Sequence, residues 1–281
     1  MTFRSFFGAA VLFGASGIAI GQETISLSRQ DHKAFAILAY APSPENCRGV
    51  ALISPGAGGS EQGYRYLGVS MASLGYLAVV MGHPESGRRA LREAVRGNSL
   101  RAGLAELITE PEAYRGRFMD ISAAKQWAQS RCASNESILI GHSMGAATVL
   151  MEAGARNKVG MTGAKTFSAY IALSPQGAGI LFPENAWSNI TRPVFLLTGT
   201  RDTELGNLSW QTRTEPFKSM PAGCKWLGVV DGATHMNFAG NGASRNAEEL
   251  TTKAIAAFLD GVHRGDCSVL TQFNGITIDT K

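Results

Sequence analysis

The sequence predicts an α/β protein with a mostly parallel, doubly wound sheet that carries helices on both faces. Residues 50–53 and 194–197 are apolar throughout, as in parallel strands covered by helices on both faces. Segments with helical spacing separate such runs, and this alternation is typical of a doubly wound sheet. Hydrophobic residues make up 44% and charged residues 17% of the 281 residues, which excludes a disordered chain and allows a large core.

Eight strands are expected, in the order in which apolar runs occur along the chain: 24–27, 34–40, 49–54, 76–81, 137–140, 169–173, 194–198 and 226–230. Helical spacing predicts helices over 62–74, 119–129, 144–155 and 246–259. Residues 85–118 form an insertion that is helical and rich in arginine in its first half. No repeat or low-complexity linker divides the chain, so one domain is expected over residues 22–281.

Residues 1–21 have the layout of a signal peptide. A single cation, Arg4, precedes an apolar run from Phe6 to Ile20, and the small residues Ala19 and Gly21 frame a cleavage site. The run is short for a membrane-spanning helix, which usually needs about 20 apolar residues. We therefore expect a periplasmic or secreted protein without a stable membrane anchor; an uncleaved anchor is the alternative.

The four cysteines agree with export. Cys47, Cys132, Cys224 and Cys267 all follow the predicted cleavage site, and an even number of cysteines in an oxidising compartment favours disulfides. Four cysteines allow three pairings. The spacing of the cysteines along the chain does not match that of zinc ligands. The net charge of +4 is too small to indicate a nucleic-acid partner. With no dinucleotide fingerprint and no metal cluster, neither a cofactor nor a metal ion is expected.

The strongest chemical pattern is Gly141-His142-Ser143-Met144-Gly145. The pattern alone is common, but here it follows a buried-strand run and opens a helix. A tight strand-to-helix turn needs small residues on both sides of its centre, and it leaves the serine hydroxyl exposed at the helix N-terminus. Ser143 is therefore the expected nucleophile.

A nucleophilic serine needs a histidine base and an orienting acid, which follow it in chain order in this architecture. Asp202 comes after the strand at 194–198 and His235 after the strand at 226–230, so both lie at carboxyl ends of strands. Glu204 and Asp231 are the alternative acids. His263 also follows the acid, but it lies beyond the last helix.

Two backbone amides are expected to bind a developing oxyanion. One belongs to Met144, directly after the nucleophile, and the other to Ala57 in the glycine-rich loop 54–59. This loop lacks the Lys-Ser/Thr pair of a phosphate-binding loop. A flexible glycine turn is the alternative interpretation.

Taken together, these motifs resemble those of the α/β-hydrolases, and in particular the bacterial esterases similar to dienelactone hydrolase, chlorophyllase and platelet-activating-factor acetylhydrolase, and the secreted cutinase-like polyester hydrolases. The resemblance covers about residues 30–260 and is carried by residues 54–56, 141–145, 199–202 and 234–235. It implies the α/β-hydrolase fold, with the Ser143, Asp202 and His235 triad and the Ala57 and Met144 amides. The polyester hydrolases usually have an aromatic residue where Ala57 stands, a difference that argues against a polymer substrate.

The resemblance also implies a disulfide pairing. In the α/β-hydrolase fold the strands at 49–54 and 137–140 are parallel neighbours, so Cys47 and Cys132 would meet at the same edge. The last helix would return Cys267 to Cys224. The pairs Cys47–Cys132 and Cys224–Cys267 are therefore expected.

The expected function is hydrolysis of a small carboxylic ester through an acyl-enzyme intermediate. His83, Trp187 and Phe238 are the candidates for contact with the substrate. Acyl transfer by the same triad and ligand binding without catalysis remain as alternatives. The acyl chain, the alcohol and the oligomeric state are left open.

Overall fold

A computed structural model describes residues 21–42, 47–203, 208–242, 244–268 and 273–281. The predicted signal peptide lies outside these ranges except for Gly21, the first residue of the first strand.

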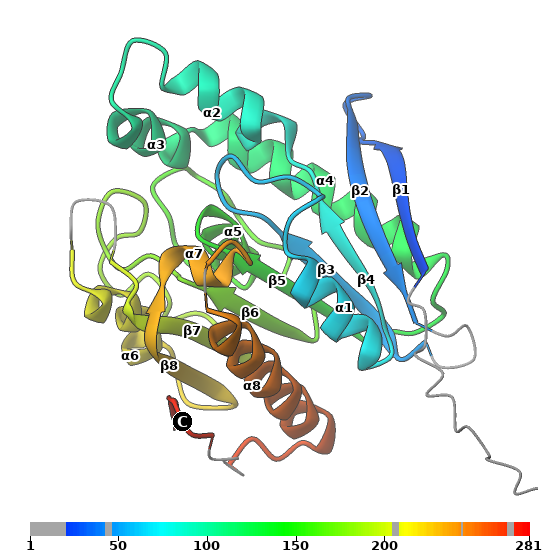
Figure 1. Ribbon diagram of the computed structural model, residues 1–281, viewed down its shortest axis with the longest axis vertical. Helices are drawn as coiled ribbons and strands as arrows, with labels where there is room; N and C mark the ends of the chain where they lie inside the picture. Colours follow the sequence, from blue (N-terminus) through cyan, green and yellow to red (C-terminus); the bar gives the residue numbers. More distant parts are fainter. Residues whose placement is uncertain (1–20, 43–46, 204–207, 243, 269–272) are drawn as a thin grey trace, which may run out of the picture.

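One nine-stranded sheet runs through the molecule (Figure 1). Its strands are β1 (Gly21–Ser28), β2 (Ala34–Ala41), β3 (Gly49–Ser54), β4 (Tyr76–Met81), β5 (Ser137–His142), β6 (Ala169–Leu173), β7 (Val194–Arg201), β8 (Lys225–Thr234) and β9 (Ile276–Thr280). They lie in the order β1-β2-β4-β3-β5-β6-β7-β8-β9. The six strands from β4 to β8 in this order are parallel, while β1, β2 and β9 pair antiparallel. The predicted doubly wound, mostly parallel sheet is confirmed.

The prediction of eight strands was wrong by one. Strand β9 pairs antiparallel with β8 from Trp226↔Thr280 to Val230↔Ile276. Its residues alternate between exposed and half-buried, as expected at a sheet edge, so it lacks the continuous apolar run by which the other strands were found. Strands β7 and β8 also continue past their predicted ends, to Arg201 and Thr234.

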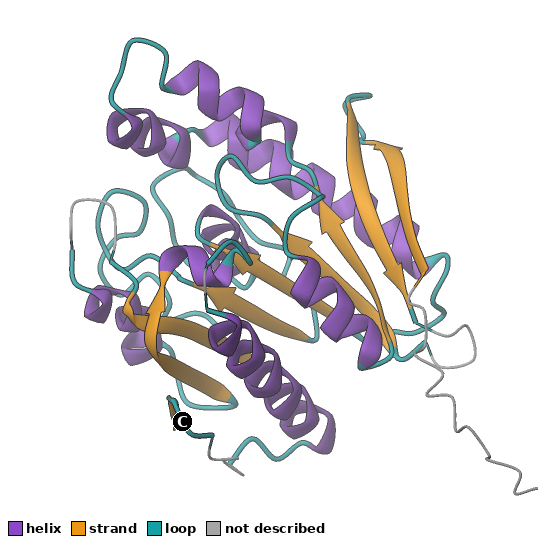
Figure 2. Ribbon diagram, in the orientation of Figure 1, coloured by secondary structure: helices purple, strands orange, loops and turns teal. Residues whose placement is uncertain are grey.

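Helices cover both faces of the sheet (Figure 2). Helices α4 (Pro111–Gln129) and α5 (Met144–Glu152) pack on one face, where Leu52, Ile121 and Leu150 belong to one core cluster. Helices α1 (Arg65–Ser73) and α8 (Arg245–Arg264) pack on the other, where Ile53 and Phe258 belong to a second cluster. The remaining helices are η2 (Pro84–Ser86), α2 (Arg88–Ala94), α3 (Leu100–Thr109), η3 (Trp210–Thr214), α6 (Glu215–Ser219) and α7 (His235–Phe238).

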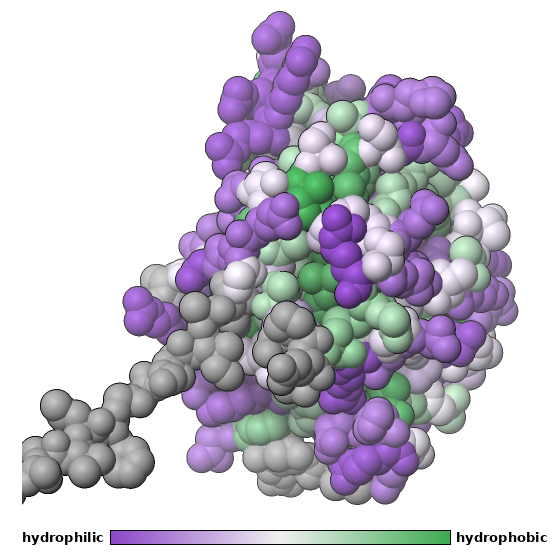
Figure 3. Space-filling model, turned by 90° about the vertical axis from the view of Figure 1, so that its right-hand side faces the viewer, coloured by the Kyte–Doolittle hydropathy of each residue, from purple (hydrophilic) through white to green (hydrophobic). Residues whose placement is uncertain are grey.

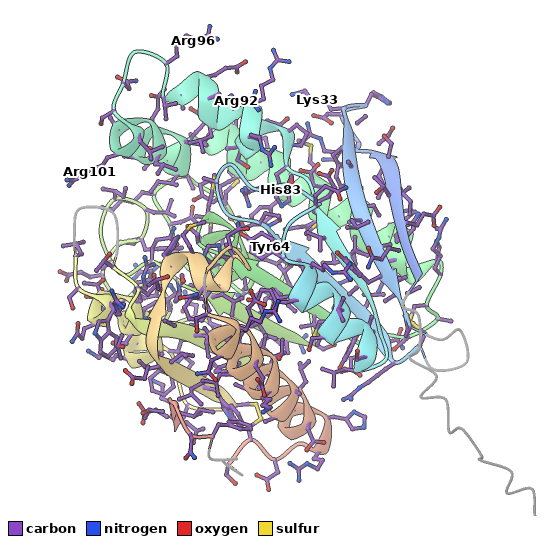
Figure 4. The ribbon with its side chains drawn as sticks, viewed as in Figure 1. Lys33, Tyr64, His83, Arg92, Arg96 and Arg101 are labelled. Carbon is purple, nitrogen blue, oxygen red and sulfur yellow. A yellow bond between two sulfur atoms is a disulfide. The ribbon has the colours of Figure 1, made fainter. Side chains whose placement is uncertain are left out.

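The insertion at 85–118 is helical over most of its length, not only in its first half. It contains η2, α2, α3 and the first two turns of α4, which begins at Pro111 instead of residue 119. Proline is favoured at the first helical position, and the Glu110 side chain caps the helix by accepting a hydrogen bond from Glu112 N. Arg92 of α2, Arg96 of the turn after α2 and Arg101 of α3 project outward (Figure 4).

Both expected disulfides are present. Cys47 is bonded to Cys132 with the Cα atoms 5.8 Å apart, and Cys224 is bonded to Cys267 with the Cα atoms 5.2 Å apart. Cys47 and Cys132 precede the parallel neighbours β3 and β5, so this bridge joins the amino ends of the two central strands. The bridges therefore lie at the amino ends of the parallel strands. Ser143, Asp202 and His235 lie at the opposite, carboxyl ends.

The side of the molecule beside β1 carries apolar atoms in its middle and polar atoms around them (Figure 3). A hollow of about 370 Å³ next to β1 and β2 is lined in part by Cys47, Leu77 and Trp127, again toward the amino ends of the strands. No helix within the described ranges has the length and apolar character needed to cross a bilayer.

Removing the bridge between β3 and β5 should lower stability without changing the fold. We expect replacement of both Cys47 and Cys132 by Ala to reduce the free energy of unfolding by about 2–4 kcal/mol, because the unfolded chain loses a constraint on its conformations. Denaturant unfolding of the oxidised proteins measures this difference. An unchanged unfolding midpoint, with native circular dichroism, would contradict the stabilising role.

Candidate active site

Ser143 lies at a strained turn between β5 and α5. Its φ of 55° and ψ of −116° are unusual for a residue other than glycine, and strain of this kind is concentrated at functional sites. His142 and Met144 on either side are buried, whereas Ser143 is partly exposed. The turn therefore presents the serine side chain at the carboxyl edge of the sheet, as the sequence predicted.

The two glycines of the motif are required by close approach of backbone. A Cβ atom on Gly145 would lie 1.9 Å from the carbonyl oxygen of Ser54, and one on Gly141 would lie 2.2 Å from the carbonyl oxygen of Gly145. Any side chain at these positions would push α5 away from β3 and β5. The packing of the helix against the sheet therefore depends on the two glycines.

Asp202 and His235, which the sequence analysis assigns as acid and base, are hydrogen-bonded to each other. Asp202 Oδ1 lies 2.9 Å from His235 Nδ1, and Asp202 Oδ2 accepts a hydrogen bond from Thr198 Oγ1 at 3.0 Å. An ionised carboxylate can only accept, so His235 Nδ1 carries the proton and Nε2 is left as the basic nitrogen. Burial acts to raise the pKa of Asp202, but the His235 hydrogen bond and the Arg213 charge together hold it below its usual value.

The alternative acids and base lie elsewhere. Asp231 is exposed and accepts a hydrogen bond from Thr200 Oγ1 at 3.1 Å. His263 is exposed in the last turn of α8. Glu204 lies outside the described residues. Of the three candidate acids, Asp202 is thus the one that the structure shows hydrogen-bonded to His235.

His142 connects the turn that carries Ser143 to His235. The rings of His142 and His235 have centroids 4.6 Å apart, and His142 Nε2 lies 3.1 Å from the carbonyl oxygen of His235. That carbonyl can only accept, so Nε2 donates. Burial and the neighbouring His235 hold the pKa of His142 well below its usual value, so the ring is neutral and its Nδ1 accepts.

Tyr64 completes this connection at the other side of His142. Its hydroxyl lies 2.9 Å from His142 Nδ1 and accepts a hydrogen bond from Gly56 N at 3.0 Å. Burial raises the pKa of Tyr64 to about 12, so the hydroxyl keeps its proton and donates a hydrogen bond to His142 Nδ1. One directed chain of hydrogen bonds therefore runs from the loop after β3 through Tyr64 and His142 to the backbone of His235.

Arg213 was missed by the sequence analysis. Its buried guanidinium Nε lies 3.0 Å from Asp202 Oδ1 and donates to the Asp202 carbonyl oxygen at 2.8 Å. The other nitrogens donate to the carbonyl oxygens of Ser174, Pro175 and Thr203. Arg213 thus joins the loops after β6 and β7 and places a positive charge beside Asp202. No local pattern distinguishes it, because its partners come from two distant loops.

The loop at 54–59 packs against the serine turn. A Cβ atom on Gly56 would lie 3.2 Å from Ser143 Cβ, so this backbone is in contact with Ser143. Within the described part of the chain, neither Ala57 N nor Met144 N donates a hydrogen bond in the folded protein. Both amides therefore remain free to bind a further acceptor.

The three expected substrate contacts are instead in the interior. His83, Trp187 and Phe238 are 3%, 1% and 0% exposed. Trp187 packs on Phe182, with ring centroids 5.3 Å apart, and His83 hydrogen-bonds to Ser54 Oγ and Asp120 Oδ2. Aromatic and polar residues near strand ends serve packing here, so their assignment to the substrate is corrected.

Exposed apolar side chains do occur at the carboxyl ends of the parallel strands, on the same side of the sheet as Ser143 and His235. Met236, next to His235, is 49% exposed, and Ile180, in the loop after β6, is 57% exposed. Both follow the carboxyl ends of parallel strands, where open α/β sheets bind ligands. Across the described ranges, no group of three His, Cys, Asp or Glu residues is arranged to hold a metal ion.

Comparison with known proteins finds cutinases that are similar in sequence and hydrolases that are similar in fold. No family model matches the chain. Cutinase 1 of Thermobifida cellulosilytica is 26% identical over 229 residues, which cover 79% of this chain and 72% of that protein. A cutinase of Thermobifida fusca is also 26% identical over 229 residues, and the match spans 63% of its length.

Solved structures agree in fold. The esterase Pf2001 of Pyrococcus furiosus superposes with a TM-score of 0.60 at 14% identity, covering 90% of this chain and 97% of that one. A putative dienelactone hydrolase of Klebsiella pneumoniae gives a TM-score of 0.62 at 14% identity, covering 85% and 99%. At these identities the likeness concerns the fold.

Replacing Tyr64 by Phe should destabilise the site. The change leaves Gly56 N and His142 Nδ1 buried without their partner, and a buried unsatisfied group costs about 1–3 kcal/mol of folding free energy. The matched control is Tyr66→Phe, which loses a single hydrogen bond to the Phe238 carbonyl oxygen. Denaturant unfolding should show the larger loss for Tyr64→Phe; equal losses would contradict the connecting role of Tyr64.

Asp120 should make stability depend on pH. Burial, reinforced by Glu85 and only partly offset by Arg29, raises the pKa of Asp120 from 3.8 to about 8. Between these values the folded chain binds a proton that the unfolded chain has released. The contribution of Asp120 to stability is therefore complete below pH 3.8 and is lost as the pH rises through 8.

Comparison with Asp120→Asn between pH 6.5 and 8 tests this expectation. The free energy of unfolding of the wild type should fall relative to the variant, by up to about 1.4 kcal/mol per pH unit. Parallel pH profiles of the two proteins would show that Asp120 is ionised in the folded state.

Proposed function

The chain has the α/β-hydrolase fold, and we propose that it hydrolyses carboxylic esters with Ser143 as nucleophile, His235 as base and Asp202 as the orienting acid. The observation that carries the proposal is the 2.9 Å hydrogen bond from His235 Nδ1 to the buried Asp202 carboxylate. It leaves Nε2 as the basic nitrogen of a histidine that contacts the serine turn through His142. The similarity to cutinases supports the reaction class.

Acylation begins when Ser143 Oγ attacks the ester carbonyl carbon and gives its proton to His235 Nε2. The negative charge that develops on the carbonyl oxygen is stabilised by the amides of Ala57 and Met144. His235 then donates the proton to the departing alcohol. In deacylation the same histidine activates a water molecule, which releases the acid and restores Ser143.

The charged state of His235 during the reaction is stabilised by Asp202. The carboxylate stays ionised at neutral pH because its pKa is held below the usual value by the His235 hydrogen bond and the charge of Arg213, despite burial. Thr198 and Arg213 hold its oxygens in place, so the imidazole keeps the tautomer that catalysis requires.

Ala57 has a small side chain where an aromatic residue would be expected for a polyester substrate, so we propose a small or monomeric ester. The exposed Met236 and Ile180 would form the apolar surroundings of the acyl group. We further propose that the protein is exported, since its two disulfides are typical of oxidising compartments. No contact among the described residues favours acyl transfer or binding without catalysis.

Hydrolysis of p-nitrophenyl esters from acetyl to long acyl chains tests the proposal. We expect Ser143→Ala to lower kcat by roughly 10³-fold or more while leaving the protein folded, because the covalent step is lost. The rate should be highest with short chains, and a fluorophosphonate should label the wild type but not the variant.

Ser73→Ala provides the matched control, since Ser73 lies at the end of α1 and hydrogen-bonds only to the carbonyl oxygen of Val69 among the described residues. It should retain wild-type kcat. A folded Ser143→Ala protein that hydrolyses these esters at the wild-type rate would refute the assignment.

A further inference from the structure

Arg117 is a buried arginine that contacts the loop after β3. It lies in α4 and is 1% exposed. Its Nη1 donates to the carbonyl oxygen of Pro55 at 2.7 Å and to Ser54 Oγ at 3.1 Å. Its Nη2 lies 3.5 Å from the carbonyl oxygen of Gly56, and its Nε donates to Ser86 Oγ at 2.8 Å. Three of these four contacts are with residues 54–56, at the end of β3 and the start of the loop that carries Ala57.

The charge of Arg117 has no carboxylate partner at ion-pair distance in the described part of the chain. Burying a guanidinium away from water is costly, and even a paired buried charge is weak support for stability. Its hydrogen bonds go to main-chain carbonyls and serine hydroxyls instead. Such contacts determine the direction of peptide groups, which a hydrophobic side chain of similar size could not do.

The peptide between Pro55 and Gly56 is held at both ends. Its carbonyl oxygen accepts from Arg117, and its N–H donates to the Tyr64 hydroxyl on the opposite side. Tyr64 and His83 both lie in the interior near this loop (Figure 4). The orientation of the first peptide of the loop is thus set by two side chains from different elements.

The next peptide carries the amide of Ala57. Its carbonyl oxygen, that of Gly56, accepts from Gly59 N at 3.1 Å and faces Arg117 Nη2. The peptide is trans, so its N–H points away from that carbonyl. Arg117 therefore directs the Ala57 N–H toward the side of the loop that faces away from α4, and this loop contacts Ser143 through Gly56.

A second layer of buried polar groups supports Arg117. Ser54 Oγ, besides its contact with Arg117, lies 2.9 Å from His83 Nε2, and His83 Nδ1 lies 2.8 Å from Asp120 Oδ2. Arg29 Nη1 in turn lies 3.4 Å from Asp120 Oδ1. These groups repeat the Ser-His-Asp order of a triad, but all are buried, so a substrate has no access to Ser54. The layer fixes the end of β3 from which the loop departs.

We propose that Arg117 is a positioning residue that orients the Ala57 amide toward the oxyanion. The proposal rests on the proposed hydrolysis by Ser143. Arg117 touches neither substrate nor reacting atoms; it acts through the peptide groups of Pro55 and Gly56. Its removal should weaken stabilisation of the transition state more than binding of the neutral substrate.

Arg117→Met is the principal variant, and Lys225→Met is its matched control. Lys225 is equally buried and donates to the carbonyl oxygens of Thr191 and Gly223, at the amino end of β8 and away from the site. Both variants lose a buried cation that binds main-chain carbonyls. Only Arg117→Met loses contact with the loop that carries Ala57.

The readouts are kcat and KM for p-nitrophenyl acetate, thermal unfolding, and inhibition by butylboronic acid, whose adduct with Ser143 places an oxygen in the oxyanion site. For Arg117→Met we expect kcat to fall roughly 10- to 100-fold with KM within about twofold, and the inhibition constant to rise in parallel. Lys225→Met should unfold at lower temperature but keep wild-type kcat and inhibition.

Each other outcome overturns a defined part of the inference. Folded Arg117→Met with the kcat of Lys225→Met would remove the positioning role and leave the proposed function intact. Absence of Ser143-dependent hydrolysis in the wild type would refute the proposed function and this role with it. If Arg117→Met does not fold, Arg117→Lys decides: one ammonium cannot replace the separate contacts of Nη1 with Pro55 and Nη2 with Gly56, so an intermediate kcat supports the role and a wild-type kcat overturns it.

Discussion

The carboxyl ends of the parallel strands impose one constraint on which the site depends: backbone carbonyls there leave the ladder and need donors from elsewhere. Two buried arginines supply them. Arg117 donates to carbonyl oxygens in the loop after β3, and Arg213 donates to those in the loops after β6 and β7. A guanidinium suits this task because it presents five donors in a fixed plane and keeps its charge at neutral pH. The loops that carry Ala57 and Asp202 are thereby each hydrogen-bonded to an arginine from another part of the chain.

The two arginines differ in how their charge is compensated. One stabilises an ionised carboxylate in its loop, and the other orients peptide groups in its loop. Arg213 lies beside the Asp202 carboxylate and helps to keep it ionised next to His235. Arg117 has only neutral partners within hydrogen-bond distance among the described residues, so its field is directed at peptide dipoles. Through α4, the insertion at 85–118 therefore brings Arg117 into contact with the loop after β3.

Burial separates two similar side-chain arrangements in this protein. Ser54, His83 and Asp120 are hydrogen-bonded in the order of a triad, yet all three are in the interior. Ser143 is partly exposed on a strained turn, and the His235 side chain is 32% exposed beside a buried acid. The same residue types thus form a structural support in one place and an accessible site in the other, and chemistry requires access.

The sequence by itself determined the doubly wound sheet, the serine turn and the strand ends that carry Asp202 and His235, because periodicity and turn chemistry are local properties. It did not reveal Arg117, because the predicted helix begins at residue 119, whereas in the structure Arg117 shares the helical spacing of the buried Ala113, Ile121 and Ala124. Only the tertiary structure decided that Arg117 and Arg213 bind distant carbonyl oxygens. It also decided that the three candidate substrate contacts are buried, and that β9 is the outermost strand beside β8. The physical reason is that burial of a polar group depends on partners brought from far along the chain.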